Sequence, residues 1–343
     1  MKILHIGSCD NIITDFVGLI KGSFNFSGHE FLLDSNMADK DLPLSSNVHL
    51  AGRSKIGRLI HLAKCLIKMH QANKIIIHGL TDIRLVQILF FCPWLLKKCY
   101  WIIWGGDLYV FRQGEQTKRW RKEEFFRRPV IKNMGNLVSY IKGDVDLARL
   151  WYGAKGVYHE CIMYTSNLYK EYAVQPKKNN SINILVGNSA DAGNNHEEAL
   201  AKLLPFRDKD ISIYVPLSYG DQVYAQQVIG FGKEWFGDKF KPLTEFIPFQ
   251  KYLELLGSID IAIFNHKRQQ AMGNTIVLVG LGKTVYLRSD VTQWQLFQDM
   301  GIVVGDTLRF SSLGRVCSDD NKSKVREYFS KGNLINQLER IFA

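Results

Sequence analysis

Short apolar runs alternate with helical patterns through the first half of the chain. The runs predict buried strands at 2–7, 30–34, 74–78, 100–104 and 137–141. Apolar residues at helical spacing predict helices near 11–21, 54–72, 81–91 and 144–153. Because strands that alternate with helices usually pack as a parallel sheet with helices on both faces, this half is expected to be a doubly wound α/β domain.

The same alternation returns after a polar stretch at 174–181, which reads VQPKKNNS and is the best candidate for a linker. Further strands are predicted at 182–187, 211–216, 245–248, 260–265 and 284–288. The chain is therefore expected to hold two doubly wound domains, 1–173 and 182–343, that face each other across a cleft. Such a cleft suits two substrates, because open α/β sheets bind ligands at the carboxyl ends of their strands.

Composition narrows the class of protein. A length of 343 residues allows each domain its own core, and 46% hydrophobic with 22% charged residues is typical of a folded chain. Six cysteines without a CxxC pair favour free thiols in a reducing cytosol. The chain opens on a strand pattern, so no cleavable signal peptide is expected, and the most apolar stretch, about 85–96, is too short to span a bilayer.

Positive charge is concentrated in the first half of the chain. Residues 1–170 hold 24 Lys/Arg against 14 Asp/Glu, whereas residues 171–343 hold 20 against 19. Two segments, 52–74 and 118–128, each carry six cations among apolar or aromatic residues, which suits an anionic membrane surface. The alternative is a surface helix whose charged side is solvated and whose apolar stripe packs on the sheet. For 52–74 the apolar stripe is expected to pack on the domain, which would leave only the flanks of the helix to contact a membrane. Nucleic acid is not an expected partner, because no known binding module is recognisable.

Several cofactor motifs are absent. The loop after the first strand lacks GxGxxG, and no GxxxxGK[ST] occurs, which excludes the common dinucleotide and P-loop sites. Two DxD triplets at 144–146 and 208–210 are expected to be structural, as a helix start and a polar loop, since no other ligand-type residues accompany them. Neither a metal nor a cofactor is expected.

Two glycine-bearing segments in the second half look most like a ligand site. Residues 182–189 and 261–275 each read as a buried strand that ends in a polar, glycine-containing loop before a helix. This geometry aims backbone N–H groups and the positive end of the helix at whatever lies above the sheet edge. Lys267 and Arg268 add positive charge to the second segment, which therefore suits a diphosphate.

Three blocks of the chain resemble one known family. They are 100–109 (YWIIWGGDLY), 184–191 (ILVGNSAD) followed by Asn195 and His196, and 268–275 (RQQAMGNT). The family is that of the TDP-4-acetamido-4,6-dideoxygalactose transferases (TDP-Fuc4NAc:lipid II transferases, glycosyltransferase family 56). The resemblance implies a GT-B fold, a TDP-sugar donor in the C-terminal domain and a polyprenyl-diphosphate-linked saccharide as acceptor on the N-terminal side. It also implies a peripheral protein at the cytoplasmic face of the bacterial inner membrane, acting in surface-polysaccharide synthesis of the O-antigen or enterobacterial common antigen type.

Arg268 is the leading candidate on the donor side. Charge grows on the diphosphate as the glycosidic bond breaks, and a guanidinium beside a helix N-terminus stabilises that leaving group without a metal. A surface arginine that caps a loop is the alternative. The other residues expected to contact the donor, several of which would equally serve as turn, cap or core residues, are Gly187, Asn188, Ser189, Tyr219, Gln269, Gln270, Gly273, Asn274 and Thr275.

Asp107 and His78 end two strands of the first domain and are candidates for the base that deprotonates the acceptor hydroxyl. Asp107 would otherwise cap a helix, and His78 would otherwise be a buried, hydrogen-bonded histidine. Asp10 and Asp15 are weaker candidates. The sequence does not separate retention from inversion, because it offers no assignable pair of catalytic carboxylates. Two other functions stay open: a nucleotide-sugar epimerase of the same architecture, and a non-catalytic protein that binds glycan or lipid phosphate.

Overall fold

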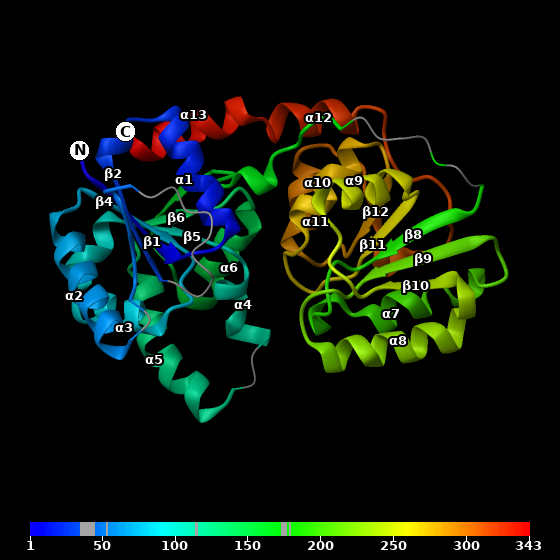
Figure 1. The fold of residues 1–343 in the computed structure, drawn as a ribbon, viewed down its shortest axis with the longest axis horizontal. Coiled ribbons are helices and arrows are strands. Elements are labelled where there is room, and N and C mark those ends of the chain that lie inside the picture. Colours follow the sequence, from blue (N-terminus) through cyan, green and yellow to red (C-terminus); the bar gives the residue numbers. More distant parts are fainter. Residues whose placement is uncertain (35–44, 53, 114–115, 173–176, 178–179) are drawn as a thin grey trace. The chain divides into compact units, whose positions relative to one another are not determined.

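The computed structural model describes residues 1–34, 45–52, 54–113, 116–172, 177 and 180–343. These residues divide into two compact units: Met1–Ser166 with Lys331–Ala343 form unit 1, and Asn167–Ser330 form unit 2 (Figure 1). The expected boundary assigned all of 182–343 to the second domain, whereas the last helix, α13 (Lys331–Phe342), lies with unit 1. Most of the predicted linker at 174–181 lies outside the described residues, which omit 174–176 and 178–179.

Unit 1 is built on a seven-stranded parallel sheet of order β3-β2-β1-β4-β5-β6-β7. The strands are β1 (Ile3–Ser8), β2 (His29–Asp34), β3 (Val48–Leu50), β4 (Lys74–His78), β5 (Cys99–Ile102), β6 (Asn136–Val138) and β7 (Val157–His159). Strands are added outward from β1 on one side and from β4 on the other. The strand order therefore reverses between β1 and β4, the place where doubly wound sheets bind ligands.

Helices cover both faces of this sheet (Figure 1). They are α1 (Asn11–Ser23), α2 (Lys55–Gln71), α3 (Ile83–Phe91), α4 (Gly106–Gln113), α5 (Lys118–Lys132), α6 (Lys142–Tyr152) and α13. The alternation of side chains along β1 explains the layering, because successive residues point to opposite faces. Leu4 and Ile6 join the core cluster that contains residues of α2 to α6, whereas His5 contacts Phe16 of α1 and Phe342 of α13.

Unit 2 repeats the plan with a six-stranded parallel sheet of order β10-β9-β8-β11-β12-β13. The strands are β8 (Ile182–Val186), β9 (Ile211–Pro216), β10 (Phe240–Leu243), β11 (Ile261–Phe264), β12 (Thr284–Leu287) and β13 (Gly305–Asp306). The helices are α7 (His196–Ala201), α8 (Gln222–Phe236), α9 (Phe249–Ser258), α10 (Met272–Gly280), α11 (Thr292–Asp299) and α12 (Asn321–Tyr328). Here the order reverses between β8 and β11, the two strands that precede the glycine-bearing loops.

Two sequence predictions are wrong. The strand predicted at 245–248 lies at β10 instead, because Phe240 is buried against α8 beside Gly232 while Phe246 is 85% exposed. The apolar stripe of 52–74 does not pack on the domain: Ile56, Leu59, Ile60 and Ile67 are each 57–73% exposed, and the buried residues of α2 are Cys65 and Met69. We call the exposed residues Ile56, Leu59, Ile60, Ala63 and Ile67 the α2 apolar face.

Candidate active site

The two glycine-bearing loops of unit 2 meet at the carboxyl ends of β8 and β11, where the strand order reverses. Gly187 continues the ladder by donating its N–H to the Ile263 carbonyl at 3.0 Å. Side chains then join the loops: Gln270 Nε2 donates to Asn188 Oδ1 at 3.2 Å, and Asn195 Nδ2 donates to the Asn265 carbonyl at 3.0 Å. The predicted donor residues of both loops therefore lie together at one sheet edge.

Asn194 is the hub of this edge. Its Oδ1 accepts from the Asn188 backbone N–H at 2.9 Å and pairs with His266 Nε2 at 2.7 Å. Its Nδ2 donates to the carbonyls of Ser189 and Asp191. A fully buried amide with four partners fixes the loop after β8 against the loop after β11. Sequence reasoning missed Asn194 and His266, although both lie in the loops that follow buried strands, His266 two residues after β11 and Asn194 eight residues after β8.

Arg268 points into the same cluster. Its Nη2 donates to Asp191 Oδ2 at 3.1 Å, and a Cβ placed on Gly193 would lie 3.6 Å from Gln270 Oε1 and 3.8 Å from Arg268 Nε. Helix α10 begins directly afterwards, with Ala271 at φ +57° turning the chain and Thr275 Oγ1 donating to the Ala271 carbonyl at 3.0 Å. The first N–H groups of α10 have no partner within the helix and present its positive end beside the guanidinium.

Several buried polar atoms of this cluster lack a hydrogen-bond partner among the described residues. They are His196 Nε2, Asn265 Nδ2, His266 Nδ1 and Gln270 Oε1. Burial lowers the pKa of His196 to about 4 and that of His266 to about 3, so both rings are neutral at pH 7. Unsatisfied buried polar groups are costly and rare in native proteins. Four of them in the loops and helix start at the carboxyl ends of β8 and β11 indicate an edge arranged to bind a polar ligand.

The remaining donor candidates lie around this edge. Tyr219 follows β9, is 58% exposed, and its hydroxyl accepts from Asn188 Nδ2 at 3.1 Å. In the first turn of α10, half-buried Asn274 donates to the Tyr252 hydroxyl at 2.9 Å beside half-buried Gly273. Ser189 and Thr275 are buried, and Gln269 offers its carbonyl to Arg268 at 3.3 Å. Tyr252 and Gln293, which bonds Thr275 Oγ1 at 3.2 Å, were not predicted from the sequence.

Position 187 needs glycine for two reasons, its backbone conformation and the closeness of neighbouring side chains. Its φ of +70° disfavours any residue with a Cβ, and a Cβ there would lie 2.4 Å from His196 Nε2. We expect Gly187→Ala to lower the free energy of unfolding by about 2–3 kcal/mol through strain and overpacking. Gly282→Ala is the matched control, because Gly282 has φ +72° and nothing within 4 Å of its added Cβ. Equal thermal midpoints for the two variants would contradict the close packing of Gly187 on His196.

In unit 1, His78 belongs to a buried chain of hydrogen bonds. Its Nδ1 lies 2.7 Å from the Tyr164 hydroxyl and its Nε2 lies 3.1 Å from His5 Nδ1, while His5 Nε2 lies 2.9 Å from His29 Nδ1. Trp104 Nε1 donates to the Tyr164 oxygen at 2.8 Å. Because an indole N–H only donates, the Tyr164 hydroxyl accepts from Trp104 and can donate to His78. His78 can then donate to His5, and His5 to His29, with all three imidazoles neutral.

Burial lowers the pKa of His78 to about 3 and that of His29 to about 4, and it holds the pKa of His5 well below its ordinary value. An imidazole with such a pKa is a weak base at neutral pH. Asp107, the other candidate base, is 3% exposed and accepts from Leu80 N, Trp101 Nε1 and Trp104 N at 2.8, 2.6 and 3.0 Å. It thereby ties the loop after β4 to the loop after β5.

The two weaker candidates lie on or before α1. Asp10 ends the loop after β1 and caps α1 by accepting from Ile13 N at 2.8 Å, and burial raises its pKa. Asp15 is exposed one turn into the helix. Among the described residues, no group of three histidine, cysteine or acidic side chains is placed to hold a metal ion, and the helices that are described include none long and apolar enough to cross a membrane.

Solved structures share this fold along the whole chain. Sucrose-phosphate synthase from Thermosynechococcus elongatus superposes with a TM-score of 0.66 at 12% identity, covering 100% of this chain and 98% of that one. Anabaena HepE in complex with UDP gives 0.67 at 9%, covering 100% and 99%. An E. coli trehalose-6-phosphate protein bound with UDP-2-fluoro glucose gives 0.63 at 9%, covering 99% and 98%. Identities this low indicate a common fold alone, which is GT-B and confirms the prediction.

The sequence itself matches a family model. The model is described as 4-alpha-L-fucosyltransferase glycosyl transferase group 56, and it covers residues 42–309, well over half of the chain. This span includes all three blocks on which the resemblance rested, and it begins in unit 1 and ends in unit 2. The chain therefore belongs to the 4-alpha-L-fucosyltransferase family, glycosyltransferase group 56, and is a glycosyltransferase of GT-B fold.

Proposed function

We propose that this protein transfers a 4-amino-4,6-dideoxyhexose, 4-acetamido-4,6-dideoxygalactose (Fuc4NAc), from TDP to a polyprenyl-diphosphate-linked saccharide. The observation that carries the proposal is the edge of unit 2 at which Arg268, the start of α10 and two buried atoms without a partner, Gln270 Oε1 and His266 Nδ1, come together. Family membership adds the reaction class. Such a reaction belongs to the synthesis of bacterial surface polysaccharide of the O-antigen or enterobacterial common antigen type.

The proposed chemistry needs positive charge at the diphosphate. When the bond between the sugar and the diphosphate breaks, negative charge develops on the leaving oxygens. Arg268 and the N–H groups of α10 would receive that charge, and Asp191 would exchange its ion pair for one with the diphosphate. Arg268 and the start of α10 would supply the positive charge that a divalent metal ion supplies in other enzymes, so the proposal extends to metal-independent transfer.

The nucleoside would lie toward β9. Tyr219 is the exposed aromatic side chain at this edge, and its hydroxyl is held by Asn188. An aromatic ring held in this way suits stacking with a pyrimidine base such as thymine. The donor is therefore proposed to lie with its base near Tyr219 and its diphosphate near Arg268.

Asp107 and His78 are proposed as positioning residues in unit 1 rather than as the base itself. Both are nearly inaccessible, and both have their hydrogen-bonding atoms occupied by groups of the same unit. They would keep the carboxyl edge of the sheet in one arrangement for the acceptor. Replacing either residue is expected to change the arrangement of that edge, rather than to remove the base that accepts the proton.

Unit 1 is proposed to bind an anionic membrane through α2. The α2 apolar face is unpartnered within the described unit, and α2 carries Lys55, Arg58, Lys64 and Lys68 without an acidic residue. An amphipathic helix of this kind lies in the headgroup region with its apolar side inward, while its cations pair with lipid phosphate. The protein would then act peripherally at the cytoplasmic face of the inner membrane, where a polyprenyl-linked acceptor is held.

We expect Ile60→Asp to weaken binding to phosphatidylglycerol-containing vesicles about 10- to 100-fold, because a 63% exposed apolar side chain would no longer enter the bilayer. Leu150→Asp, at a 74% exposed position on α6, is the matched control and should bind like the wild type. Cosedimentation measured at low and high salt checks both. Wild-type protein that stays in solution, or two variants that behave alike, would rule out the α2 apolar face as the contact.

The donor is tested by calorimetric titration with TDP, UDP and GDP, first without metal and then with magnesium. We expect TDP to bind without magnesium, because Arg268 would meet the diphosphate. We also expect TDP to bind at least tenfold more tightly than the purine nucleotide GDP, because the place beside Tyr219 is proposed for a pyrimidine base. Transfer from TDP-Fuc4NAc to a prenyl-linked saccharide should follow. Donor turnover without any acceptor would favour an epimerase, and absence of nucleotide binding would favour an accessory protein.

A further inference from the structure

A pocket of about 340 Å³ lies at the amino ends of the strands in unit 1. Residues that lie one or two positions before β1, β2, β3 and β4 border it, namely Lys2, Ser27, Asn47 and Ala72. Doubly wound sheets receive their substrates at the opposite edge, where the strands have their carboxyl ends. The proposed transfer therefore makes no use of this pocket, although its volume is in the range of small-molecule sites. We call it the amino-edge pocket.

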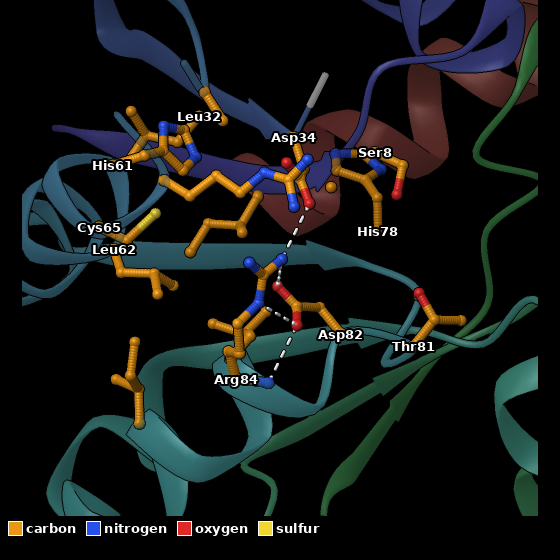
Figure 2. Close-up of a pocket in the computed structure, with 17 residues that line it drawn as sticks. Ser8, Leu32, Asp34, His61, Leu62, Cys65, His78, Thr81, Asp82 and Arg84 are labelled. Carbon is orange, nitrogen blue, oxygen red and sulfur yellow. Dashed lines mark hydrogen bonds and ion pairs between the residues drawn. The ribbon is translucent and has the colours of Figure 1, made fainter. Parts of the chain in front are cut away.

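Helix α2 forms one wall of the amino-edge pocket with Lys64, Lys68 and Gln71. The inner side of the helix is marked by buried Cys65, which Figure 2 shows on the side of α2 that faces Arg84. At about 100° per residue, the two lysines and Gln71 lie on the flank between this inner side and the α2 apolar face. The amino-edge pocket therefore adjoins the surface that is proposed to rest on the membrane.

Positive charge prevails in the amino-edge pocket. Its lining includes Lys2, Lys64 and Lys68. Glu30 is the one carboxylate among the described residues of that lining, and its Oε1 lies 3.0 Å from both Lys68 Nζ and His49 Nε2. Lys68 therefore offsets the charge of Glu30. Neither Lys2 nor Lys64 forms an ion pair with any residue that the structure describes. Two cations without a counter-charge in a concave site attract an anion.

Groups that suit hydroxyls lie beside these cations. The second carboxylate oxygen of Glu30 is used by neither Lys68 nor His49 and can accept a hydrogen bond. Gln71 is exposed and offers a donor and an acceptor on the wall formed by α2, and Ser27 adds a hydroxyl. The amino-edge pocket thus combines positions for a singly charged phosphate with positions for hydroxyl groups.

We propose that the amino-edge pocket binds the headgroup of phosphatidylglycerol. The phosphodiester would lie between Lys2 and Lys64, and the two glycerol hydroxyls would form hydrogen bonds with Glu30 and Gln71. This inference rests on the proposed contact of α2 with an anionic membrane, and it adds which lipid that contact selects. Phosphatidylethanolamine fits less well, because its ammonium group would meet the lysines.

The depth of α2 in the bilayer would bring the amino-edge pocket to the lipid phosphates. An amphipathic helix lies with its apolar side about 5–10 Å into the boundary between headgroups and acyl chains. The flanks of such a helix are at the level of the headgroups, and Lys64, Lys68 and Gln71 lie on a flank of α2. A lipid could therefore place its headgroup in the amino-edge pocket while its acyl chains stay in the bilayer.

The test uses the full chain and vesicles of equal surface charge that contain either phosphatidylglycerol or phosphatidylmethanol, which has the same phosphodiester without the glycerol hydroxyls. In cosedimentation we expect the wild type to bind phosphatidylglycerol vesicles about fivefold more tightly, because two hydrogen bonds distinguish the lipids. Lys64→Gln should remove this preference, because the phosphodiester would no longer be held beside Glu30 and Gln71. Lys55→Gln is the matched control, since it removes one cation from α2 outside the amino-edge pocket. It should weaken binding to both kinds of vesicle by the same factor and keep the preference.

Soluble probes separate a lipid headgroup from free phosphate. In calorimetric titration, glycerophosphoglycerol, which is the headgroup without acyl chains, should bind the wild type about tenfold more tightly than Lys64→Gln. Inorganic phosphate should bind at least threefold more weakly than glycerophosphoglycerol, because it lacks the glycerol hydroxyls. Inorganic phosphate that binds as tightly as glycerophosphoglycerol would overturn the lipid as the ligand.

The outcomes also separate this inference from the proposed function. Equal binding of the wild type to both kinds of vesicle, or a preference that survives Lys64→Gln, would overturn the headgroup site and leave the contact through the α2 apolar face standing. Wild-type protein that binds neither kind of vesicle would overturn that contact and this inference together. TDP binding is measured on the same preparations, so a protein that prefers phosphatidylglycerol but never binds TDP would refute the proposed donor and leave this inference standing.

Discussion

Replacing Arg268 by alanine is expected to lower kcat for sugar transfer by ~10²–10³ and to weaken TDP binding in the same protein. The reason is that the guanidinium, at the start of α10, would meet charge that is larger in the transition state than in the bound donor. Arg268→Lys should recover part of the loss, since an ammonium keeps the charge without the fork of donors. Transfer from TDP-Fuc4NAc measured at saturating acceptor checks the expectation.

The matching control is Arg309→Ala, which removes a cation from the same unit at a side chain that is 90% exposed. Neither change should shift the thermal midpoint much, because the Arg268–Asp191 pair is partly exposed and such pairs add little to stability. An Arg268→Ala protein that transfers sugar and binds TDP like the Arg309→Ala protein would remove Arg268 from the site. A large loss of stability would instead assign Arg268 to the fold.

Lowering the pH from 7 to 5 is expected to destabilise unit 1 through its histidine chain. The pKa of His78 is about 3 in the folded unit against 6.5 in an unfolded chain, so the unfolded chain binds more protons below pH 6.5. Stability is therefore full above about pH 6.5 and falls as the pH drops toward 3. For His78 alone the loss at pH 5 is about 2 kcal/mol. His5 and His29 change it in the same direction, because the pKa of each is lowered too.

Hydrogen exchange of peptides that contain β1 and β4, corrected for the pH dependence of chemical exchange, measures this loss. In His78→Gln the slope of stability against pH near 5.5 should fall by about one proton, or roughly 1.4 kcal/mol per pH unit. His70→Gln is the control, because His70 is exposed on α2. Opening free energies that stay level from pH 7 to 5 in the wild type would show that the histidines of the chain protonate without cost.

Much of the fold could be read from local pattern. The apolar runs at β1, β4, β8 and β11 are the central strands of the two sheets, and strands buried on both faces need continuous apolar residues. Edge strands bury fewer side chains, so the apolar pattern that predicts them is weaker. This explains why β10 was placed too far along the chain and why the three-residue β3 and β7 were missed.

The residues of the candidate sites also divide into those that local pattern predicts and those that only the folded units bring together. Strand ends followed by glycine and polar residues predicted Gly187, Asn188 and Arg268, because a parallel sheet brings such ends to one edge whatever its strand order. Which residues they contact depends on pairs distant in sequence: Asn194 with His266 across 72 residues, and His5 with His78 across 73. No local period encodes those pairings.

For this protein, then, periodicity and the three family blocks were sufficient for the two parallel sheets, the GT-B fold and the family. Tertiary packing alone decided which side of α2 is exposed, because helical spacing reveals an apolar stripe but not whether a partner covers it. Packing also decided that His78 and Asp107 are enclosed. Burial is a property of everything around a side chain, and only the assembled units determine it.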